Sequence, residues 1–331
     1  MARFYSNFLS FTLLLALVVI VLGAYTRLAD AGLGCPDWPG CYGHLTVPED
    51  TSQSGFDRPL EPAKAWAEMI HRYVAGTLGI VILIAFLFAV FKREVRERVG
   101  VIMPFLLLCT VVFQALLGMW TVTKLLSPVI VTAHLIGGFT TLSLSWIIWL
   151  RSRRDPAAKY PTVIVSGGIK LLGMLALLAV IAQIVLGGWT STNYAAIACG
   201  TSFPTCHGSL WPAADFAQGF SLEQQMQEGV DYEYGILESP ARTAIHITHR
   251  AGAIVVLILV GLLSLSLLMA KRDAFGGLAK MMLLLLTGQI TLGILNVVMA
   301  LPIGIATAHN LVAALLLLLL IAVNYRFITE H

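Results

Sequence analysis

Long uninterrupted runs of apolar residues alternate with short polar segments along this chain. Eight of the runs approach the roughly 20 residues that a helix needs to cross a bilayer. Because the runs are continuous rather than alternating, they predict helices and exclude the strands of a membrane barrel. The expected spans are 8–26, 67–91, 101–121, 129–150, 169–189, 244–270, 281–301 and 303–324.

The second half of the chain repeats the pattern of the first. MIHRYVAG at 69–76 aligns with ITHRAGAI at 247–254, and the stretch 114–134 aligns with 289–309, each running from a glutamine to a Thr-Ala-His step. The pattern predicts an all-α integral membrane protein whose eight transmembrane helices form two tandem four-helix bundles related by internal duplication. The expected modules are 1–160 and 161–331.

Composition agrees with a membrane protein. Apolar residues fill 58% of 331 positions and charged residues 12%, far from the balance of a soluble domain. The first span lacks a small-residue cleavage site and has a counterpart in the second half, so it predicts a retained helix rather than a signal peptide.

Charge predicts the orientation. Basic residues cluster in one set of loops, whereas the opposite loops, 28–66 and 191–243, are acidic on balance. By the positive-inside rule, both termini are expected in the cytoplasm and the two long loops outside. The net charge of +3 reflects this bias and does not indicate a nucleic-acid partner. The basic set is Lys92, Arg93, Arg96, Arg98, Arg151, Arg153, Arg154, Lys159, Lys271, Arg272 and Lys280.

Each outward loop holds two cysteines, Cys35 with Cys41 and Cys199 with Cys206. An oxidising compartment permits disulfides, and we predict one within each loop. The separations differ from the C-x-x-C of thiol oxidoreductases, so two interpretations stay open: a structural clip on each loop, or a redox-active pair in at least one. Zinc is disfavoured, because His207 beside Cys206 gives at most three nearby ligands.

Four histidines lie near the outer starts of apolar helices: His71, His134, His249 and His309. An ionisable residue inside a span is costly unless it faces the bundle interior and has a partner. Imidazole binds haem iron well, and each half offers two at a similar depth. We therefore predict bis-histidine haem ligation in each half, with paired proton-relay or structural histidines as the alternative.

The two halves differ one helical turn before the first histidine of each pair. Glu68 precedes His71, whereas His246 precedes His249. Residues three apart share a helix face, so Glu68 is expected near the edge of a ligated haem, where a carboxylate accepts a proton or stabilises positive charge. The alternative is a rim charge that pairs with a headgroup-level cation. The difference suggests one reactive half and one electron-carrying half.

Other polar residues of the spans have more ordinary interpretations. Arg72 and Arg250 adjoin candidate ligands and are predicted to bind haem propionates, with snorkelling to headgroups as the alternative. Gln114, Gln183 and Gln289 are read as interhelical contacts. Cys109 in the third span is read as inert filler.

Several motifs together resemble the heme A synthase family, membrane enzymes of bacterial and mitochondrial type that oxidise haem O. The C-P-D-W-P-G-C run and E-x-x-H-R are the most specific, and the similarity extends over essentially the whole chain. The motifs are TRLADAGLGCPDWPGC at 26–41, EMIHR at 68–72, TAHLIGG at 132–138, FPTCHG at 203–208, THRAGA at 248–253 and TAHN at 307–310.

The resemblance implies an oxidoreductase that converts the C8 methyl group of haem O to a formyl group, giving haem A for cytochrome c oxidase biogenesis. It implies that His71 and His134 ligate the substrate haem and that His249 and His309 ligate a haem b, through which electrons leave. It further implies a catalytic Glu68 and a Cys35–Cys41 pair that matters to activity. His246 and the second cysteine pair receive no firm role.

The resemblance also implies a setting. The enzyme is expected in the bacterial cytoplasmic membrane, supplied by the farnesyltransferase that makes haem O, and it needs an electron acceptor that the sequence does not identify. Two other functions also suit four buried histidines: a diheme, quinol-linked cytochrome b without substrate chemistry, and a haem carrier or transporter.

Overall fold

The computed structural model describes residues 2–51, 55–154, 165–269 and 273–329. Every regular element in these ranges is a helix, and eight helices are long and apolar enough to cross a membrane, which confirms the predicted number and type of spans. The eight are α1 (Ala2–Leu28), α2 (Pro62–Phe91), α4 (Ile102–Thr123), α5 (Pro128–Arg153), α6 (Gly167–Thr192), α8 (Ser239–Met269), α9 (Asp273–Val298) and α10 (Ile303–Thr329). Two short helices, α3 (Arg93–Val99) and α7 (Phe216–Gly219), lie in the connections.

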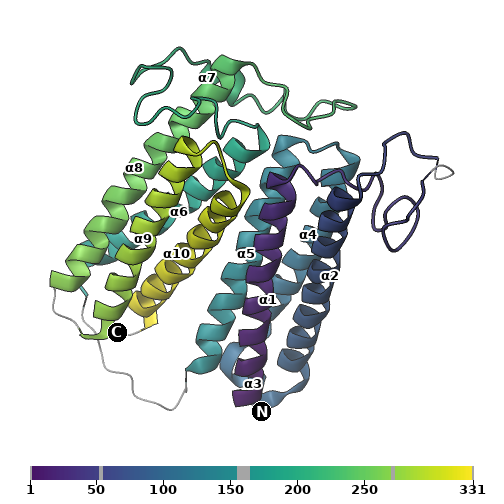
Figure 1. Cartoon of the computed structure of the whole chain (residues 1–331). Helices are drawn as coiled ribbons and strands as arrows, with labels where there is room; N and C mark the ends of the chain where they lie inside the picture. The colour runs from purple at the N-terminus through teal and green to yellow at the C-terminus, as the bar shows by residue number, and fades with distance from the viewer. Residues whose placement is uncertain (1, 52–54, 155–164, 270–272, 330–331) are drawn as a thin grey trace.

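The long helices form two four-membered rings that lie side by side (Figure 1). In the first unit α1 packs on α2, α2 on α4, α4 on α5, and α5 back on α1; in the second, α6, α8, α9 and α10 close in the same order. The units meet where α10 contacts α1 and α5, and where α5 contacts α6. The same packing order in both units is what an internal duplication predicts, and the duplication itself stays a prediction. The predicted module boundary at 160 and 161 lies outside the described residues.

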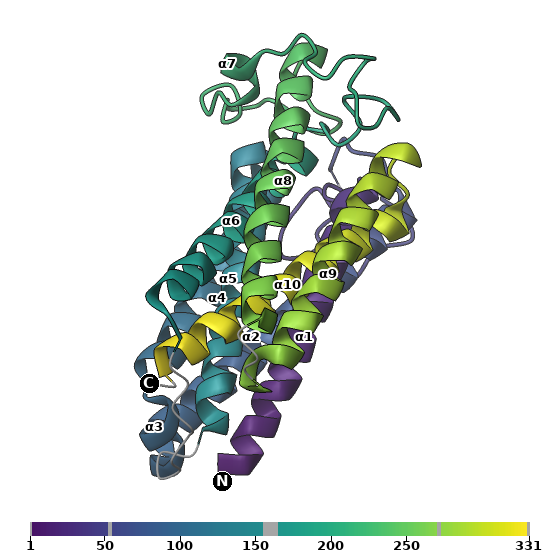
Figure 2. The same cartoon turned by 90° about the vertical axis from the view of Figure 1, so that its left-hand side faces the viewer.

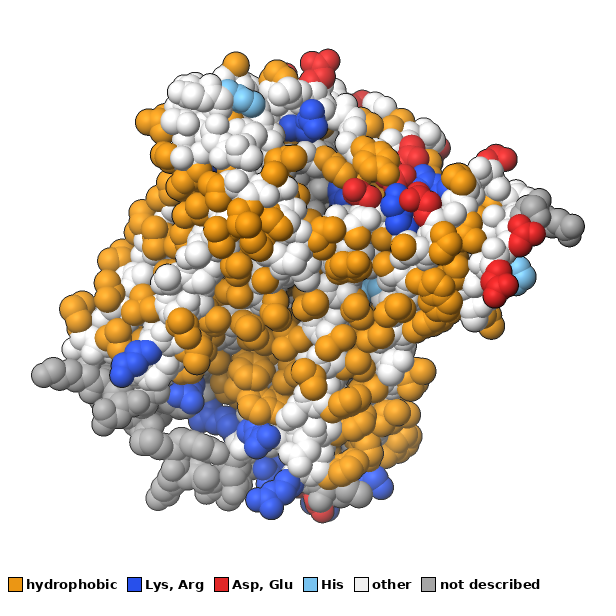
Figure 3. All heavy atoms as spheres, in the orientation of Figure 1, with side chains coloured by type: hydrophobic (Ala, Val, Ile, Leu, Met, Phe, Trp, Pro, Cys, Tyr) orange, Lys and Arg blue, Asp and Glu red, His pale blue; other side chains and the backbone are white. Residues whose placement is uncertain are grey.

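The two ends of the molecule differ in character. Both chain termini lie at one end, and both cysteine loops and α7 lie at the other (Figures 1 and 2). We call these the terminal end and the disulfide end. A belt of apolar side chains separates them, with Lys and Arg gathered mainly at the terminal end and Asp and Glu mainly at the disulfide end (Figure 3). Three of the basic residues on which the orientation rests, Lys159, Lys271 and Arg272, lie outside the described residues.

Some helix limits differ from those that the apolar runs predict. α2 and α8 begin at Pro62 and Ser239, about a turn before the expected starts at 67 and 244. Their first turns are held by close packing on loops: a Cβ at Gly34 would stand 2.6 Å from the backbone of Lys64. The prediction 281–301 for the seventh span was wrong at both ends. α9 begins at Asp273 and ends at Val298, because the following turn places Ala300 and Leu301 at φ of 56° and 61°, a left-handed conformation that a right-handed helix cannot contain.

Candidate functional site

Each unit places its two histidines on helices at opposite corners of the ring. His71 lies on α2 and His134 on α5, while His249 lies on α8 and His309 on α10. All four are nearer the disulfide end than the terminal end of their helices. His134 is within electrostatic range of His71, and His249 is within range of His309. The fold therefore brings the two histidines of each unit toward one another across the bundle.

A glycine on a neighbouring helix makes room for each imidazole. A Cβ at Gly23 would stand 2.9 Å from His71 Cε1, and a Cβ at Gly293 would stand 3.2 Å from His309 Cε1. Without a side chain at these positions, the helix backbone approaches the ring closely. The other two pairs are Gly118 with His134, at 3.5 Å, and Gly187 with His249, at 3.3 Å.

The imidazoles carry unused hydrogen-bonding capacity. Nδ1 of His71, His134 and His309 is buried and has no hydrogen-bond partner within the described chain. Leaving such atoms unpaired is costly. The four rings are nevertheless only partly buried, so protein atoms do not close around them completely. Two such imidazoles in each unit would suit the iron of a haem, which imidazole nitrogens bind well.

Glu68 is buried, with 5% of its surface exposed, and it contacts two groups. Oε1 lies 2.5 Å from Arg72 Nη2, and Oε2 accepts a hydrogen bond from the backbone N–H of Cys35 at 2.9 Å. The carboxylate is therefore joined both to its own helix and to the first cysteine loop.

His246 occupies the corresponding position of the second unit and is equally buried. Arg250 Nε donates to His246 Nε2 at 3.0 Å, so the imidazole takes the place of the carboxylate beside the arginine. The predicted difference between the halves is thus a difference in chemistry at one common location. In both units an arginine one turn later donates to this side chain, which is a carboxylate in the first unit and an imidazole in the second.

The two arginines bind the backbone of the cysteine loops. Arg72 Nη1 donates to the carbonyls of Asp37, Pro39 and Gly40. Arg250 donates likewise to Ser202, Pro204 and Thr205. These bonds hold each loop over the start of a histidine helix. The role of both arginines at haem propionates stays a prediction.

Both predicted disulfides are confirmed: Cys35 bonds Cys41, and Cys199 bonds Cys206. All four cysteines are buried. The loops share a further feature, a pair of reciprocal backbone bonds, Cys41 with His44 and Cys206 with Ser209. Cys109 is a free thiol, and it is exposed on α4 rather than packed in the core.

Sequence reasoning missed the partners of two histidines. Gln183 Nε2 lies 3.1 Å from His249 Nδ1, and Gln289 Nε2 lies 3.1 Å from His309 Nε2. The sequence does contain a Q-x-x-x-G pattern, which places each glutamine one turn before the glycine that faces a histidine. That pattern predicts a glutamine–histidine contact only if the neighbouring helices are known, and the sequence alone does not give them.

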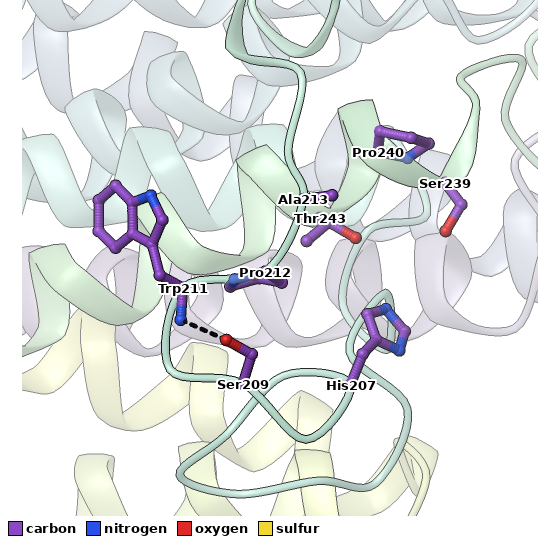
Figure 4. A pocket seen from close by; sticks show the side chains of 8 residues that line it. All are labelled: His207, Ser209, Trp211, Pro212, Ala213, Ser239, Pro240 and Thr243. Atoms are coloured by element: carbon purple, nitrogen blue, oxygen red, sulfur yellow. Dashed lines mark hydrogen bonds between the residues drawn. The ribbon is translucent and has the colours of Figure 1, made fainter.

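A pocket opens at the disulfide end of the second unit (Figure 4). Residues 207–213 of the second cysteine loop line one side, and the first two turns of α8 line the other. None of the four candidate ligands lines it. Its residues are His207, Ser209, Trp211, Pro212, Ala213, Ser239, Pro240 and Thr243.

Comparison with known proteins gives consistent matches over nearly the whole chain. The COX15-CtaA family model, described as cytochrome oxidase assembly protein, matches residues 6–321. The heme A synthase of Shewanella oneidensis is 45% identical over 327 residues, covering 96% of this chain and 94% of that protein. The heme A synthase of Nitrosospira multiformis is 26% identical over 338 residues, covering 94% of this chain and 90% of that protein. The similarity therefore includes both four-helix units and both cysteine loops.

Proposed function

Because this chain belongs to the COX15-CtaA family of cytochrome oxidase assembly proteins and functions as a heme A synthase, we propose a division of labour between its two units. The first unit binds haem O between His71 and His134 and oxidises its C8 methyl group to a formyl group. The second unit holds a haem b between His249 and His309.

The single observation that carries this proposal is the pairing of the histidines at opposite corners of each ring. Three of the four rings have a buried nitrogen without a partner among the described residues, and a glycine makes room for each ring. When bound, haem b supplies one-electron oxidation and reduction. The histidines hold their haems in place, and the surrounding apolar side chains exclude water from both sites.

The reaction requires an exit for electrons and protons. With water as the oxygen donor, conversion of a methyl to a formyl group releases four electrons and four protons. We assign proton acceptance to Glu68, because its carboxylate is buried one turn from His71. Arg72 and the Cys35 amide hold this carboxylate in one position. The disulfide between Cys35 and Cys41 fixes the loop that provides the amide.

The cellular setting follows from charge and chemistry. The basic terminal end is assigned to the cytoplasm and the disulfide end to the outside of a bacterial cytoplasmic membrane. The substrate carries a farnesyl-derived tail, so the farnesyltransferase that makes haem O is the expected supplier. Electrons that reach the second unit need an acceptor outside this chain.

Product analysis tests this function. Purified protein in lipid nanodiscs is supplied with haem O and a one-electron acceptor, and the extracted haems are separated and weighed by mass spectrometry. We expect haem A and a partly oxidised intermediate. Recovery of unchanged haem O despite a reducible haem b would indicate a diheme cytochrome instead. Recovery of unchanged haem O with no second haem would indicate a carrier.

A further inference from the structure

Glutamine side chains distinguish the two units. In the second unit Gln183 reaches from α6 to His249 on α8, and Gln289 reaches from α9 to His309 on α10, each at 3.1 Å. An amide from the neighbouring helix therefore holds one nitrogen of each candidate haem ligand. Gln183 Nε2 also donates to the backbone carbonyl of His249 at 2.9 Å, which fixes the amide against the helix that carries the ligand.

Packing confines these amides. A Cβ at Gly252 would stand 2.1 Å from Gln183 Oε1, so the amide occupies the space that a larger residue would fill. The side-chain oxygens of Gln183 and Gln289 are both buried and have no hydrogen-bond partner among the described residues. Two buried acceptors thus lie beside the two ligands without a donor.

The first unit has no equivalent side-chain contact among its described residues. Val19 lies one turn before Gly23, where the second unit has Gln183 one turn before Gly187. The valine side chain has no hydrogen-bonding group, so the His71 imidazole interacts with the backbone of Val19 instead. Gln114, the counterpart of Gln289, is present, but its amide nitrogen is buried without a partner beside Gly137. His134 contacts the backbone of Gln114 as His309 contacts the backbone of Gln289, so the side-chain contact is what differs.

This difference has a consequence for iron ligation. A histidine that gives one nitrogen to iron carries a proton on the other, and a hydrogen-bond acceptor there fixes the ring orientation and raises ligand basicity. A glutamine amide presents either its nitrogen or its oxygen after half a turn about its last side-chain bond. The unpartnered oxygen of Gln289 is therefore suited to accept that proton once iron is bound. The same half turn of Gln183 exchanges its bond to the His249 carbonyl for one from the ring N–H.

We propose that Gln183 and Gln289 are positioning residues that make the second unit a retentive haem b site, and that the lack of such amide contacts to the histidines of the first unit keeps its haem exchangeable. An enzyme whose substrate and product are both haems needs one site that releases haem and one that does not. The proposal rests on the proposed function for the identity of the two haems. The contacts that carry it are independent of the oxidation chemistry.

The test measures haem b retention without any haem O present. Wild type, Gln183→Leu, Gln289→Leu and the matched control Gln114→Leu are purified with haem b bound, and its transfer to excess apomyoglobin is followed by absorbance. We expect the first two variants to release haem b about 10–100-fold faster and the control to match wild type. Release at the wild-type rate in both variants, or equal acceleration in the control, would overturn the proposal.

A conservative pair separates positioning from packing. Gln183→Glu and Gln289→Glu keep an acceptor oxygen, so they are expected to retain haem b and to lower its midpoint potential, because a carboxylate donates more electron density through the histidine. Haem b loss from the Glu variants as fast as from the Leu variants would show a packing effect and overturn the proposal. None of these readouts requires haem A formation, so a failure of the proposed function is recognised separately.

The converse change tests the exchangeable site. Val19→Gln places an amide where the second unit has Gln183, and we expect it to slow the release of haem O from the first unit. Unchanged release from a folded Val19→Gln protein would overturn the part of the proposal that concerns the first unit.

Discussion

Glu68 binds the guanidinium group of Arg72 and the backbone N–H of Cys35 at the same time. A buried carboxylate without such partners would be costly, because it has lost its hydration. The two bonds offset that cost, and they also join the first cysteine loop to α2. Glu68 therefore has a positional role besides the proposed proton chemistry, and a useful substitution has to separate the two.

Glu68→Gln makes this separation. The amide oxygen still accepts from the Cys35 N–H, but the side chain cannot take up a proton at neutral pH. We expect at least about a hundredfold loss of haem A formation, the lower end of what general acid–base catalysis contributes, with haem b content unchanged. Extracted haem should be haem O or a partly oxidised intermediate. Near-normal haem A formation by this variant would leave Glu68 as a structural residue.

The glycines that face the histidines give a graded prediction. Gly23→Ala puts a methyl group 2.9 Å from His71 Cε1, too close for contact, whereas Gly118→Ala puts one 3.5 Å from His134 Cε1, an ordinary distance. We expect Gly23→Ala to weaken haem O binding about tenfold through a displaced ligand and Gly118→Ala to have little effect. Spectral titration with haem O measures both, and equal effects would contradict the glycine contacts.

The elements that position the site are α2 and α8 together with the cysteine loops bound to them. Arg72 and Arg250 hold the two loops in the same manner, through backbone carbonyls. A disulfide that closes a loop this short stabilises the folded state by about 2 kcal/mol at most in the chain-entropy account. Its main contribution here is to fix the loop backbone that contacts Glu68 in one unit and Arg250 in the other.

The two disulfides are therefore expected to act on different haems. Cys35→Ser should lower haem A formation while haem b content stays near normal, because the Cys35 backbone loses its fixed position beside Glu68. Cys199→Ser, the matched change in the other loop, should instead lower haem b content. Extraction and identification of the haems bound to the two purified variants tests whether the disulfides act on different haems. Identical haem profiles for the two variants would contradict separate roles.

The eight helices, the places of the four histidines and of Glu68 on them, and both disulfides could be predicted from the sequence, because each depends on local pattern or on one pair of residues in one loop; the roles of the histidines and of Glu68 stay predictions. The limits of α9 could not, since the left-handed turn at Ala300 and Leu301 follows an apolar run without interruption. The contacts of Gln183 and Gln289 could not either. Each depends on which helix is the neighbour in the ring, and apolar runs carry no information about neighbours.

At the scale of the whole molecule, the second cysteine-bearing loop extends over the first unit. Residues 225–234, which we call the strap, contact the α4–α5 connection and the first loop. Tyr232 is buried against Leu33 and Leu126 and donates its backbone N–H to Leu125 at 3.0 Å. Arg58 of the first loop pairs with Glu233 at 2.9 Å.

A second link lies between α1 and the end of α6. Tyr194 donates its hydroxyl to Asp30 at 2.8 Å, and Arg27 lies over the same ring. Burial raises the pKa of Tyr194 above its ordinary value. The two units are therefore joined by polar contacts at the disulfide end as well as by helix packing.

The strap gives a charge-reversal prediction. Arg58→Glu removes the pairs with Glu233 and with Asp231 and also places like charges side by side, so we expect the strap to detach from the first loop more often. Limited proteolysis should then cleave the strap faster, by a factor of about 2–5 for a pair worth up to about 1 kcal/mol. The double variant Arg58→Glu with Glu233→Arg should recover part of the protection. No recovery would show that the pair does not hold the strap.

The central claim is that the two histidine pairs hold two different haems, and the haem content of four single variants tests it most directly. His71→Ala, His134→Ala, His249→Ala and His309→Ala are purified after expression with haem O supplied, and the haems are extracted and identified by mass. We predict that the first two variants keep haem b and lose haem O and its products. The last two should lose haem b and accumulate unconverted haem O. Loss of one and the same haem from all four variants would contradict the two-site account.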